Sequence, residues 1–426
     1  MSLLNFSLLP AGTMLDAGRL LAARALRAFA DGYVALLLPY YLTLLGYNAL
    51  EIGIIITATL LGSGAMTLGA GLIAHRYRSR SLLAVASLLM AASGVGITLA
   101  TDFWPLLIIA LIGTLNPSSG DVSVFLPLEQ TLLTHTTPAP SRTALFARYS
   151  LIAALAAAIG AQAAALPDIA ARAAGIDIKT AIQAMFLLYA AVGLATLPIY
   201  RGLSPALEAH DDKPRAPLGP SKRMVYKLAA VFSLDAFGGG FAVQSLLALW
   251  LFQRHGLSVS EAGTVFLCTG LLGAFSQLAA APVAARFGLI NTMVFTHLPA
   301  NIFCMLIPFM PTLPLVILLL FLRSALGSMD VPARVSYVMA VVSPAERPAA
   351  AAITNVPRSL ASALSPALAG YMLTVSSFGW PLVVCGALKV VYDLTLLHMF
   401  QGIKPPEENV TSAGHITSQV NKRENT

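Results

Sequence analysis

Charged residues are scarce in this chain, since Asp, Glu, Lys and Arg make up only 11% of its 426 residues. Soluble domains carry roughly 25% charged residues, so the composition excludes a soluble globular enzyme and a disordered chain. Cysteine is also scarce, and its three residues lie inside apolar runs without metal-ligand or disulfide spacing. We therefore expect no disulfide scaffold, no metal site and no cofactor, and we interpret Cys268, Cys304 and Cys385 as small packing residues.

Apolar residues take the place of the missing charges and make up 57% of the chain. A helix needs about 20 mostly apolar residues to cross a bilayer. The runs here are continuous rather than alternating, which argues against a membrane β-barrel. The pattern predicts an all-α integral membrane protein with twelve transmembrane helices. The runs lie at 20–45, 51–74, 81–101, 104–133, 143–166, 180–199, 225–252, 261–284, 291–310, 313–341, 349–373 and 380–400.

A polar stretch that begins at Arg201 and contains four prolines separates the sixth run from the seventh. We interpret it as an extended linker between two bundles of six helices. The sequence from Gln401 onward is polar, which is typical of a disordered tail. The predicted organisation is an N-terminal bundle at 1–200, a cytoplasmic linker at 201–224, a C-terminal bundle at 225–400 and a disordered cytoplasmic tail at 401–426.

The formal charge of +7 comes from Lys and Arg residues in the loops between the runs. With both termini in the cytoplasm, sixteen of these cations lie inside and three outside, as the positive-inside rule requires. They form no basic stripe, so we expect no nucleic-acid partner. We expect a monomer in the plasma membrane or a bacterial inner membrane, with both termini cytoplasmic. The three outer cations are Arg172, Lys179 and Arg254.

The two halves of the chain resemble each other. With an offset of 210 residues, five residues of the first half recur in the same order in the second. Parallel repeats of this kind are typical of transporters, which bind their substrate between the repeats near the middle of the membrane. The predicted fold is therefore two pseudo-symmetric six-helix bundles. The matching residues are Glu51, Gly53, Leu61, Ala74 and Arg76 with Glu261, Gly263, Leu271, Ala284 and Arg286.

The loop after the second run reads GLIAHRYRSRSLL from Gly71 to Leu83. It resembles the loop 2–3 signature of the major facilitator superfamily, G-x-L-A-D-R-x-G-R-[RK]-x-x-L. His75 replaces the signature aspartate, and Arg78 replaces the second glycine. In the family the aspartate of this loop pairs charge across the interface of the outward-open state. The resemblance therefore implies a gating role for His75 and Arg76, in which His75 makes a weaker, pH-sensitive contact. The alternative is that the loop arginines only fix the topology.

The resemblance spans the whole chain and implies a secondary transporter with a central cavity lined by helices 1, 4, 7 and 10. Helix 10 carries Arg323 and Gly327 in the R-x-x-x-G spacing of the family, whereas Asn116 replaces the corresponding arginine of helix 4. The helix 5 antiporter signature G-P-x-x-G-G is missing from the sequence. The direction of coupling therefore stays open.

Five acidic residues fall within the runs that the family places around its cavity. An ionised side chain that faces lipid at the bilayer centre costs about 2.5–3.5 kcal/mol, so we expect these residues to face a wet cavity or one another. Asp235 has no cation one turn away on its own helix, so we expect it to bind a proton near neutral pH. The acids are Asp31, Asp121, Glu129, Asp235 and Asp330, of which Asp235, Asp31 and Asp121 are the proton-coupling candidates.

Helical spacing also predicts ion pairs, because residues four apart lie on the same face of a helix. The alternative is that such pairs only neutralise charge and fix helix packing. His297 is interpreted as a packing or kink residue. The predicted pairs are Arg27–Asp31, Asp330–Arg334, a local Lys389–Asp393 pair, and Glu129–Arg148 as an inner gate.

Polar residues on the same runs complete the candidate transport site. Ionisable and amide side chains at bilayer depth mark substrate and ion pathways. The substrate-cavity candidates are Arg27, Asn116, Ser123, Gln130, Gln244, Arg323, Asp330 and Arg334. The gating candidates are Glu129, Arg148, Arg358, His75 and Arg76.

The leading hypothesis is a secondary active transporter that moves a small organic solute by alternating access, coupled to protons, as in drug or metabolite efflux. We expect a small-molecule substrate, protons and the lipid bilayer as its partners. An enzyme is not expected, because the sequence contains no HExxH, GxSxG or GxxxxGK[ST] motif. The alternative is a membrane sensor or scaffold with the same fold and no net transport. The solute and its charge stay open.

Overall fold

The computed structural model describes residues 9–402 except 11, 74–76, 119–122, 139–140, 209–217 and 344–345. The described part consists of helices joined by turns and loops and contains no strand. Nine helical segments of that part are long and apolar enough to cross a membrane. The predicted all-helical membrane fold is confirmed, and the number of twelve crossings stays a prediction.

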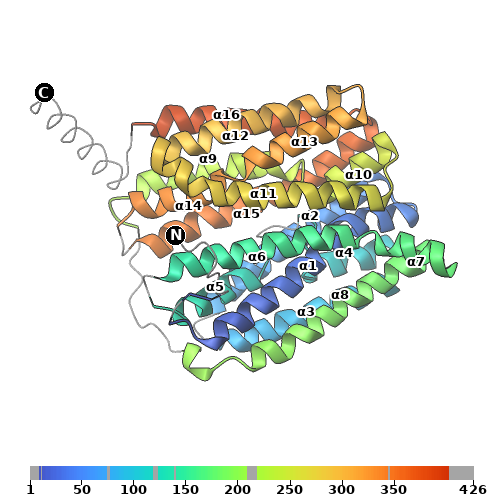
Figure 1. Ribbon diagram of the computed structural model, residues 1–426, viewed down its shortest axis with the longest axis horizontal. Coiled ribbons are helices and arrows are strands. Elements are labelled where there is room, and N and C mark those ends of the chain that lie inside the picture. Colours follow the sequence, from blue (N-terminus) through green and yellow to red (C-terminus); the bar gives the residue numbers. More distant parts are fainter. Residues whose placement is uncertain are drawn as a thin grey trace, which may run out of the picture.

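The helices form two groups that follow the order of the chain. Figure 1 shows the first group, in blue to green, along one side of the molecule and the second, in yellow-green to red, along the other. The first group contains α1 (Leu15–Leu44), α2 (Ala49–Ile73), α3 (Ser79–Leu99), α4 (Phe103–Ile112), α5 (Phe125–His135), α6 (Arg142–Ala163), α7 (Leu166–Ala174) and α8 (Ile178–Arg201). The second contains α9 (Lys222–Gly240), α10 (Gln244–His255), α11 (Val259–Phe287), α12 (Leu289–Leu306), α13 (Leu313–Gly327), α14 (Asp330–Val341), α15 (Arg347–Val375) and α16 (Trp380–Phe400).

Each of the twelve predicted apolar runs coincides with one helix or with two helices in series. Three runs are interrupted, between α4 and α5, between α9 and α10, and between α13 and α14. Proline removes a backbone donor and glycine relaxes the backbone, so both favour such breaks. The first gap contains Pro117, and the second follows the three glycines 238–240. These interruptions place irregular backbone inside the helix groups.

Small residues let the two groups approach each other closely. The α2–α15 and α6–α11 pairs form large interfaces between the groups. A Cβ atom at Gly53 of α2 would lie 2.5 Å from the backbone oxygen of Pro366, and one at Gly370 would lie 2.3 Å from the oxygen of Ala49. Glycine is therefore required where α2 crosses α15, as in many membrane helix pairs.

Hydrogen bonds join the groups from the helix breaks toward the end of the molecule that holds the α1–α2 loop. The Ser245 hydroxyl lies 2.7 Å from the oxygen of Ala35 and 2.8 Å from that of Pro117. The Thr374 hydroxyl accepts from the amide of Leu50 at 3.0 Å. We call this end of the molecule the α1–α2 loop end, and it lies opposite the start of α1. The contacts above close the interface between the two groups at this end.

Candidate functional site: a cavity between the two helix groups

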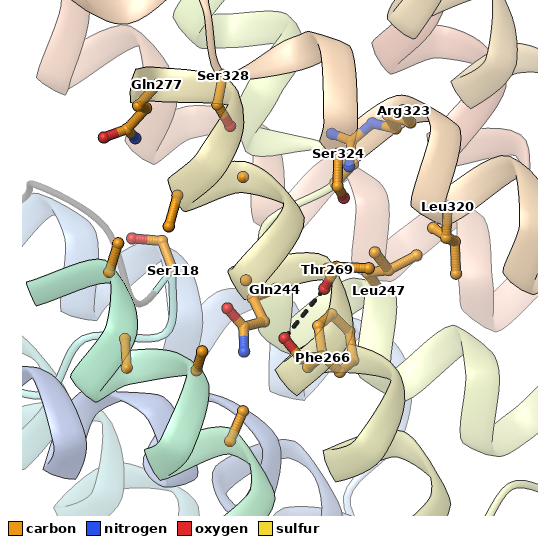
Figure 2. Close-up of a pocket in the computed structure, with 18 residues that line it drawn as sticks. Ser118, Gln244, Leu247, Phe266, Thr269, Gln277, Leu320, Arg323, Ser324 and Ser328 are labelled. Atoms are coloured by element: carbon orange, nitrogen blue, oxygen red, sulfur yellow. Dashed lines mark hydrogen bonds between the residues drawn. The ribbon is translucent and has the colours of Figure 1, made fainter. Parts of the chain in front are cut away.

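A cavity of about 360 Å³ lies between α6 of the first group and α10, α11 and α13 of the second. Figure 2 shows its lining residues, with α6 on one side and α11 and α13 on the other. The α6 wall consists of Ala154, Ala157, Ala158 and Ala161. These small side chains leave room for a ligand and offer it no hydrogen-bonding group. Cavities of about 300–1,000 Å³ hold small organic molecules.

The opposite wall carries hydrogen-bonding groups and one positive charge. Arg323 and Ser324 come from α13, where Figure 2 places their side chains next to each other. Among the described lining residues Arg323 is the one charged side chain, and none is a carboxylate. The uncharged polar residues of this wall are Gln244, Thr269, Gln277, Ser324 and Ser328, and Ser118 joins them from the first group. This wall can bind hydroxyl, carbonyl and anionic groups.

The interrupted helices supply part of the lining. Ser118 lies in the gap between α4 and α5, Gln244 begins α10, and Ser328 lies between α13 and α14. Non-helical backbone at membrane depth is tolerated where it lines a cavity. Each of the three breaks therefore ends at the same cavity.

Two predicted cavity residues, Gln244 and Arg323, line the cavity. A third, Asn116, lies directly behind the wall: its Oδ1 accepts from the Ser118 hydroxyl at 2.9 Å, and its Nδ2 lies 3.4 Å from Asp31 Oδ2. Asp31 is buried. A chain of two hydrogen bonds thus connects its carboxyl to the cavity wall.

Other predicted cavity residues lie elsewhere. The Ser123 hydroxyl accepts from the amide of Phe125 at 3.3 Å, so it supports the start of α5. Gln130 on α5 is partly buried and is not among the lining residues. Arg334 lines a smaller cavity of about 40 Å³ between α14 and α15, together with the gating candidate Arg358.

A buried cluster in the first group surrounds Glu129, whose side chain is 0% exposed. Its carboxylate pairs with Arg27 and accepts hydrogen bonds at 2.5 Å from the hydroxyls of both Tyr149 and Tyr200. The Arg27 guanidinium also lies 4.0 Å from the ring centre of Phe125. These groups come from four helices, so they hold α1, α5, α6 and α8 together.

This arrangement differs from the predicted pairs. Glu129 pairs with Arg27 on α1, whereas the prediction gave it Arg148. Arg27 was expected to pair with Asp31 one turn along, but its guanidinium points to α5, and Asp31 lies beside Asn116. Spacing along one helix does not reveal partners that packing brings from another.

A second buried cluster lies in the second group around Asp235 of α9. Lys389 Nζ on α16 is 2.6 Å from Asp235 Oδ1, and Arg334 Nη1 on α14 is 3.2 Å from Oδ2. Arg334 also lies 3.1 Å from Asp330, which confirms that predicted pair. The prediction of an unpaired Asp235 is wrong, because both cations come from other helices.

The same cluster corrects two further predictions. Lys389 pairs with Asp235 rather than with Asp393. Asp393 lies 2.9 Å from His297 Nδ1 and accepts from Asn301 Nδ2 at 2.9 Å. His297 is therefore part of a polar network and not a packing residue alone. The sequence feature that could have predicted this network is a four-residue spacing, which places two polar side chains on one helix face. It occurs in both Lys389–Asp393 and His297–Asn301.

Three candidates fall outside the described residues, namely Asp121, His75 and Arg76. Arg148 is described, and lies partly buried on α6. Within the described part of the chain, no group of three or more His, Cys, Asp or Glu side chains is arranged to hold a metal ion.

The sequence profile of the Major Facilitator Superfamily matches residues 20–313 and 228–423. The chain therefore belongs to the Major Facilitator Superfamily, a family of membrane transporters, as the loop signature predicts. It is a multi-pass membrane protein, and family and fold together support membrane transport as its function.

Individual relatives agree with this assignment. An uncharacterized membrane protein of Saccharomyces cerevisiae, YJR124C, is 25% identical over 91% of this chain and 94% of its own length. Among solved structures, a bacterial homologue of the human lysosomal transporter Spinster, in an inward-facing and occupied conformation, has a TM-score of 0.71 at 14% identity, covering 91% of this chain and 97% of that one. The nucleoside transporter NupG has a TM-score of 0.69 at 14% identity, covering 91% and 99%. At these identities the structural likeness concerns the fold.

Proposed function

We propose that this protein is a secondary active transporter that carries a small polar organic solute across the membrane by alternating access. The observation that carries the proposal is the cavity of about 360 Å³ between the two helix groups, lined by residues of both. A site at the interface of two repeats is exposed to one side or the other when the repeats rock against each other.

The contacts between the groups support an inward-facing state. The Ser245 and Thr374 hydrogen bonds hold the interface together toward the α1–α2 loop end. The excess of loop cations at the opposite end favours a cytoplasmic location for both termini. In this orientation the contacts close the protein on the outer side of a plasma membrane or bacterial inner membrane. The cavity then lies on the cytoplasmic side of these contacts.

The chemistry of the lining favours a solute with hydrogen-bonding groups and a negative charge. Arg323 offers a planar set of donors that suits a carboxylate or phosphate. Gln244, Gln277 and the serine hydroxyls can bind neutral polar groups beside it. A relative of the same fold is a nucleoside transporter, which is a further reason to include nucleosides among the solutes tested.

Proton coupling is the second part of the proposal, with Asp31 as the carboxyl that binds the proton. Two hydrogen bonds, from Asp31 to Asn116 and from Asn116 to Ser118, connect its carboxyl to the cavity wall. A change in the charge of Asp31 then changes the electrostatic potential at the cavity wall, because electrostatic interactions are strong in a low dielectric. This connection distinguishes Asp31 from Asp235, which is held by two cations.

The test begins with a thermal-shift panel of nucleosides, carboxylates and phosphate esters, followed by counterflow of each stabilising compound in proteoliposomes. Ala154 lines the cavity and its neighbour Ala156 does not. We expect Ala154→Leu to abolish counterflow by filling the cavity and Ala156→Leu to leave it intact. Arg323→Gln should weaken the binding of anionic solutes at least tenfold, which corresponds to about 1.4 kcal/mol of binding free energy. Binding without counterflow would instead favour a sensor without net transport.

The coupling is tested separately, by solute accumulation under a pH gradient. We expect Asp31→Asn to lose accumulation and to keep counterflow, because exchange of solute needs no net movement of protons. Asp177→Asn serves as the control, since Asp177 caps the start of α8 at the surface. Accumulation that ignores the gradient in the unchanged protein would overturn proton coupling.

A further inference from the structure

His297 lies between two carboxylates in the interior of the second helix group. Its Nδ1 is 2.9 Å from Asp393 Oδ1, and its Nε2 is 3.9 Å from Asp235 Oδ1. His297 is 5% exposed and Asp393 0%. Both ring nitrogens therefore face an acidic oxygen in an environment from which water is largely excluded.

The heavy atoms around Asp393 define a position for one proton. Asn301 Nδ2 lies 2.9 Å from Asp393 Oδ2 and 3.0 Å from His297 Nδ1. Either Nδ1 carries a hydrogen and donates it to Asp393, or Asp393 carries it and donates to Nδ1. If both groups lost their protons, two acceptors would face each other 2.9 Å apart, which is unfavourable when buried.

The neighbouring charges leave room for a second proton on this pair. Lys389 and Arg334 lie against Asp235 and Asp330, whereas the side chains that contact Asp393 are those of His297 and Asn301. A proton added to the imidazole places a positive charge directly beside ionised Asp393 and lets Nε2 donate toward Asp235. Two further groups face the site: Arg358 on α15, which acts electrostatically on Asp235, and the Tyr392 ring, centred 5.8 Å from that of His297.

The cluster is connected along the chain to the cavity. Asp330 begins α14 two residues after Ser328, which lines the cavity. Asp235 lies on α9, whose end leads through Ala242 to Gln244, and both of these residues line the cavity as well. A change in the pairing of Asp235 therefore acts on the two helix breaks that border a bound solute.

We propose that His297 and Asp393 together bind one exchangeable proton, at a second site distinct from Asp31. When this proton is present, the imidazolium bridges Asp393 and Asp235 and shares Asp235 Oδ1 with Lys389. When the proton leaves to water, Asp235 is held by Lys389 and Arg334 alone. The role of this proton in transport rests on the proposed function, whereas its binding does not.

The binding of the proton is tested on the full chain in lipid nanodiscs, without any solute. Nitrogen NMR of labelled histidine and infrared spectra of the carboxyl groups are recorded from about pH 5 to about pH 8, the range in which histidines titrate. We expect one of the histidine signals that change with pH to disappear in His297→Gln and to shift in Asp393→Asn. His255→Gln is the matched control, because His255 ends α10 and lies outside the cluster.

A His297 that keeps one protonation state over this range, or a titration unchanged in Asp393→Asn, would overturn the proposal. Should His297→Gln fail to fold, the Asp393→Asn comparison and the unchanged protein still decide it. In proteoliposomes we expect His297→Gln to lose accumulation under a pH gradient and retain counterflow. A protein without any counterflow would refute the transport function, and the titration would still decide the proton site.

Discussion

The ammonium group of Lys389 lies 2.6 Å from Asp235 Oδ1, so an ion pair joins α16 to α9 inside the second helix group. The Lys389 side chain is 12% exposed and that of Asp235 is 4%. A charge buried to this degree is retained in a protein when a partner of opposite sign accompanies it. The pair therefore ties α16, the last helix in the described part of the chain, to the interior of its group.

Removal of Lys389 alone should destabilise the protein, because it leaves an excess of negative charge on Asp235 and Asp330. We expect Lys389→Met to lower the free energy of unfolding by about 3 kcal/mol, measured by denaturation in detergent. The double variant with Asp235→Asn should recover part of the loss. Additive effects of the two substitutions would contradict a coupling between these residues.

The Glu129 cluster should respond most strongly to the loss of Tyr200. Its hydroxyl donates to Glu129 and accepts from Arg27 Nε at 3.0 Å, whereas Tyr149 contacts Glu129. We expect Tyr200→Phe to cost about 2 kcal/mol of stability, since hydrogen bonds to charged groups contribute about 1.5–3 kcal/mol. Tyr149→Phe should cost less. Tyr371→Phe is the control, because Tyr371 is 58% exposed, and a loss of equal size there would count against the cluster.

The closed α1–α2 loop end depends on glycine at Gly53. An added methyl group would lie 2.5 Å from the backbone oxygen of Pro366, whereas at Gly64 its nearest contact would be Leu360 at 3.9 Å. We expect Gly53→Ala to open this end and Gly64→Ala to leave it closed. Hydrogen exchange at the Leu50 amide, which donates to Thr374 at this end, should become about tenfold faster with Gly53→Ala, a shift of about 1.4 kcal/mol. Equal exchange in both variants would show that the crossing tolerates the methyl group.

The junction before α9 should loosen at acidic pH. Hydrogen bonds from the Ser221 hydroxyl and the Gly219 amide hold the pKa of Glu346 below its ordinary value of 4.5. The stabilisation is therefore complete above pH 4.5 and is lost as the pH falls through the lowered pKa. Hydrogen exchange of residues 218–222 should accelerate in that range, and Glu346→Gln should show fast exchange at every pH. Asp102→Asn, remote from the junction, should behave as the unchanged protein, and identical profiles for all three would exclude this contact.

The sequence predicts the helices and the family because both depend on local patterns. Continuous apolar runs indicate the helices, and the loop from Gly71 to Leu83 indicates the superfamily. Gln244 and Arg323 could be placed at the cavity because they lie on runs that line it in the family. The Asp330–Arg334 pair could be predicted because both residues lie on one helix.

The partners of Asp235 and Glu129 could not be predicted in the same way. Lys389 lies 154 residues from Asp235, and Arg27 lies 102 residues from Glu129, so only helix packing brings them together. The alanines of α6 gave no signal either, because a small apolar residue looks the same whether it packs against a helix or borders a cavity.

The interruption between α13 and α14 gives that crossing a joint in its middle. Ser328 and Met329 separate a segment that carries Arg323 from a segment that begins with Asp330. Because only these two residues join the helices, a change in the angle between α13 and α14 leaves each helix intact and leaves Arg323 in the cavity lining. Movement on the Asp330 side can then change the shape of one end of the cavity while the contacts made by α13 stay in place.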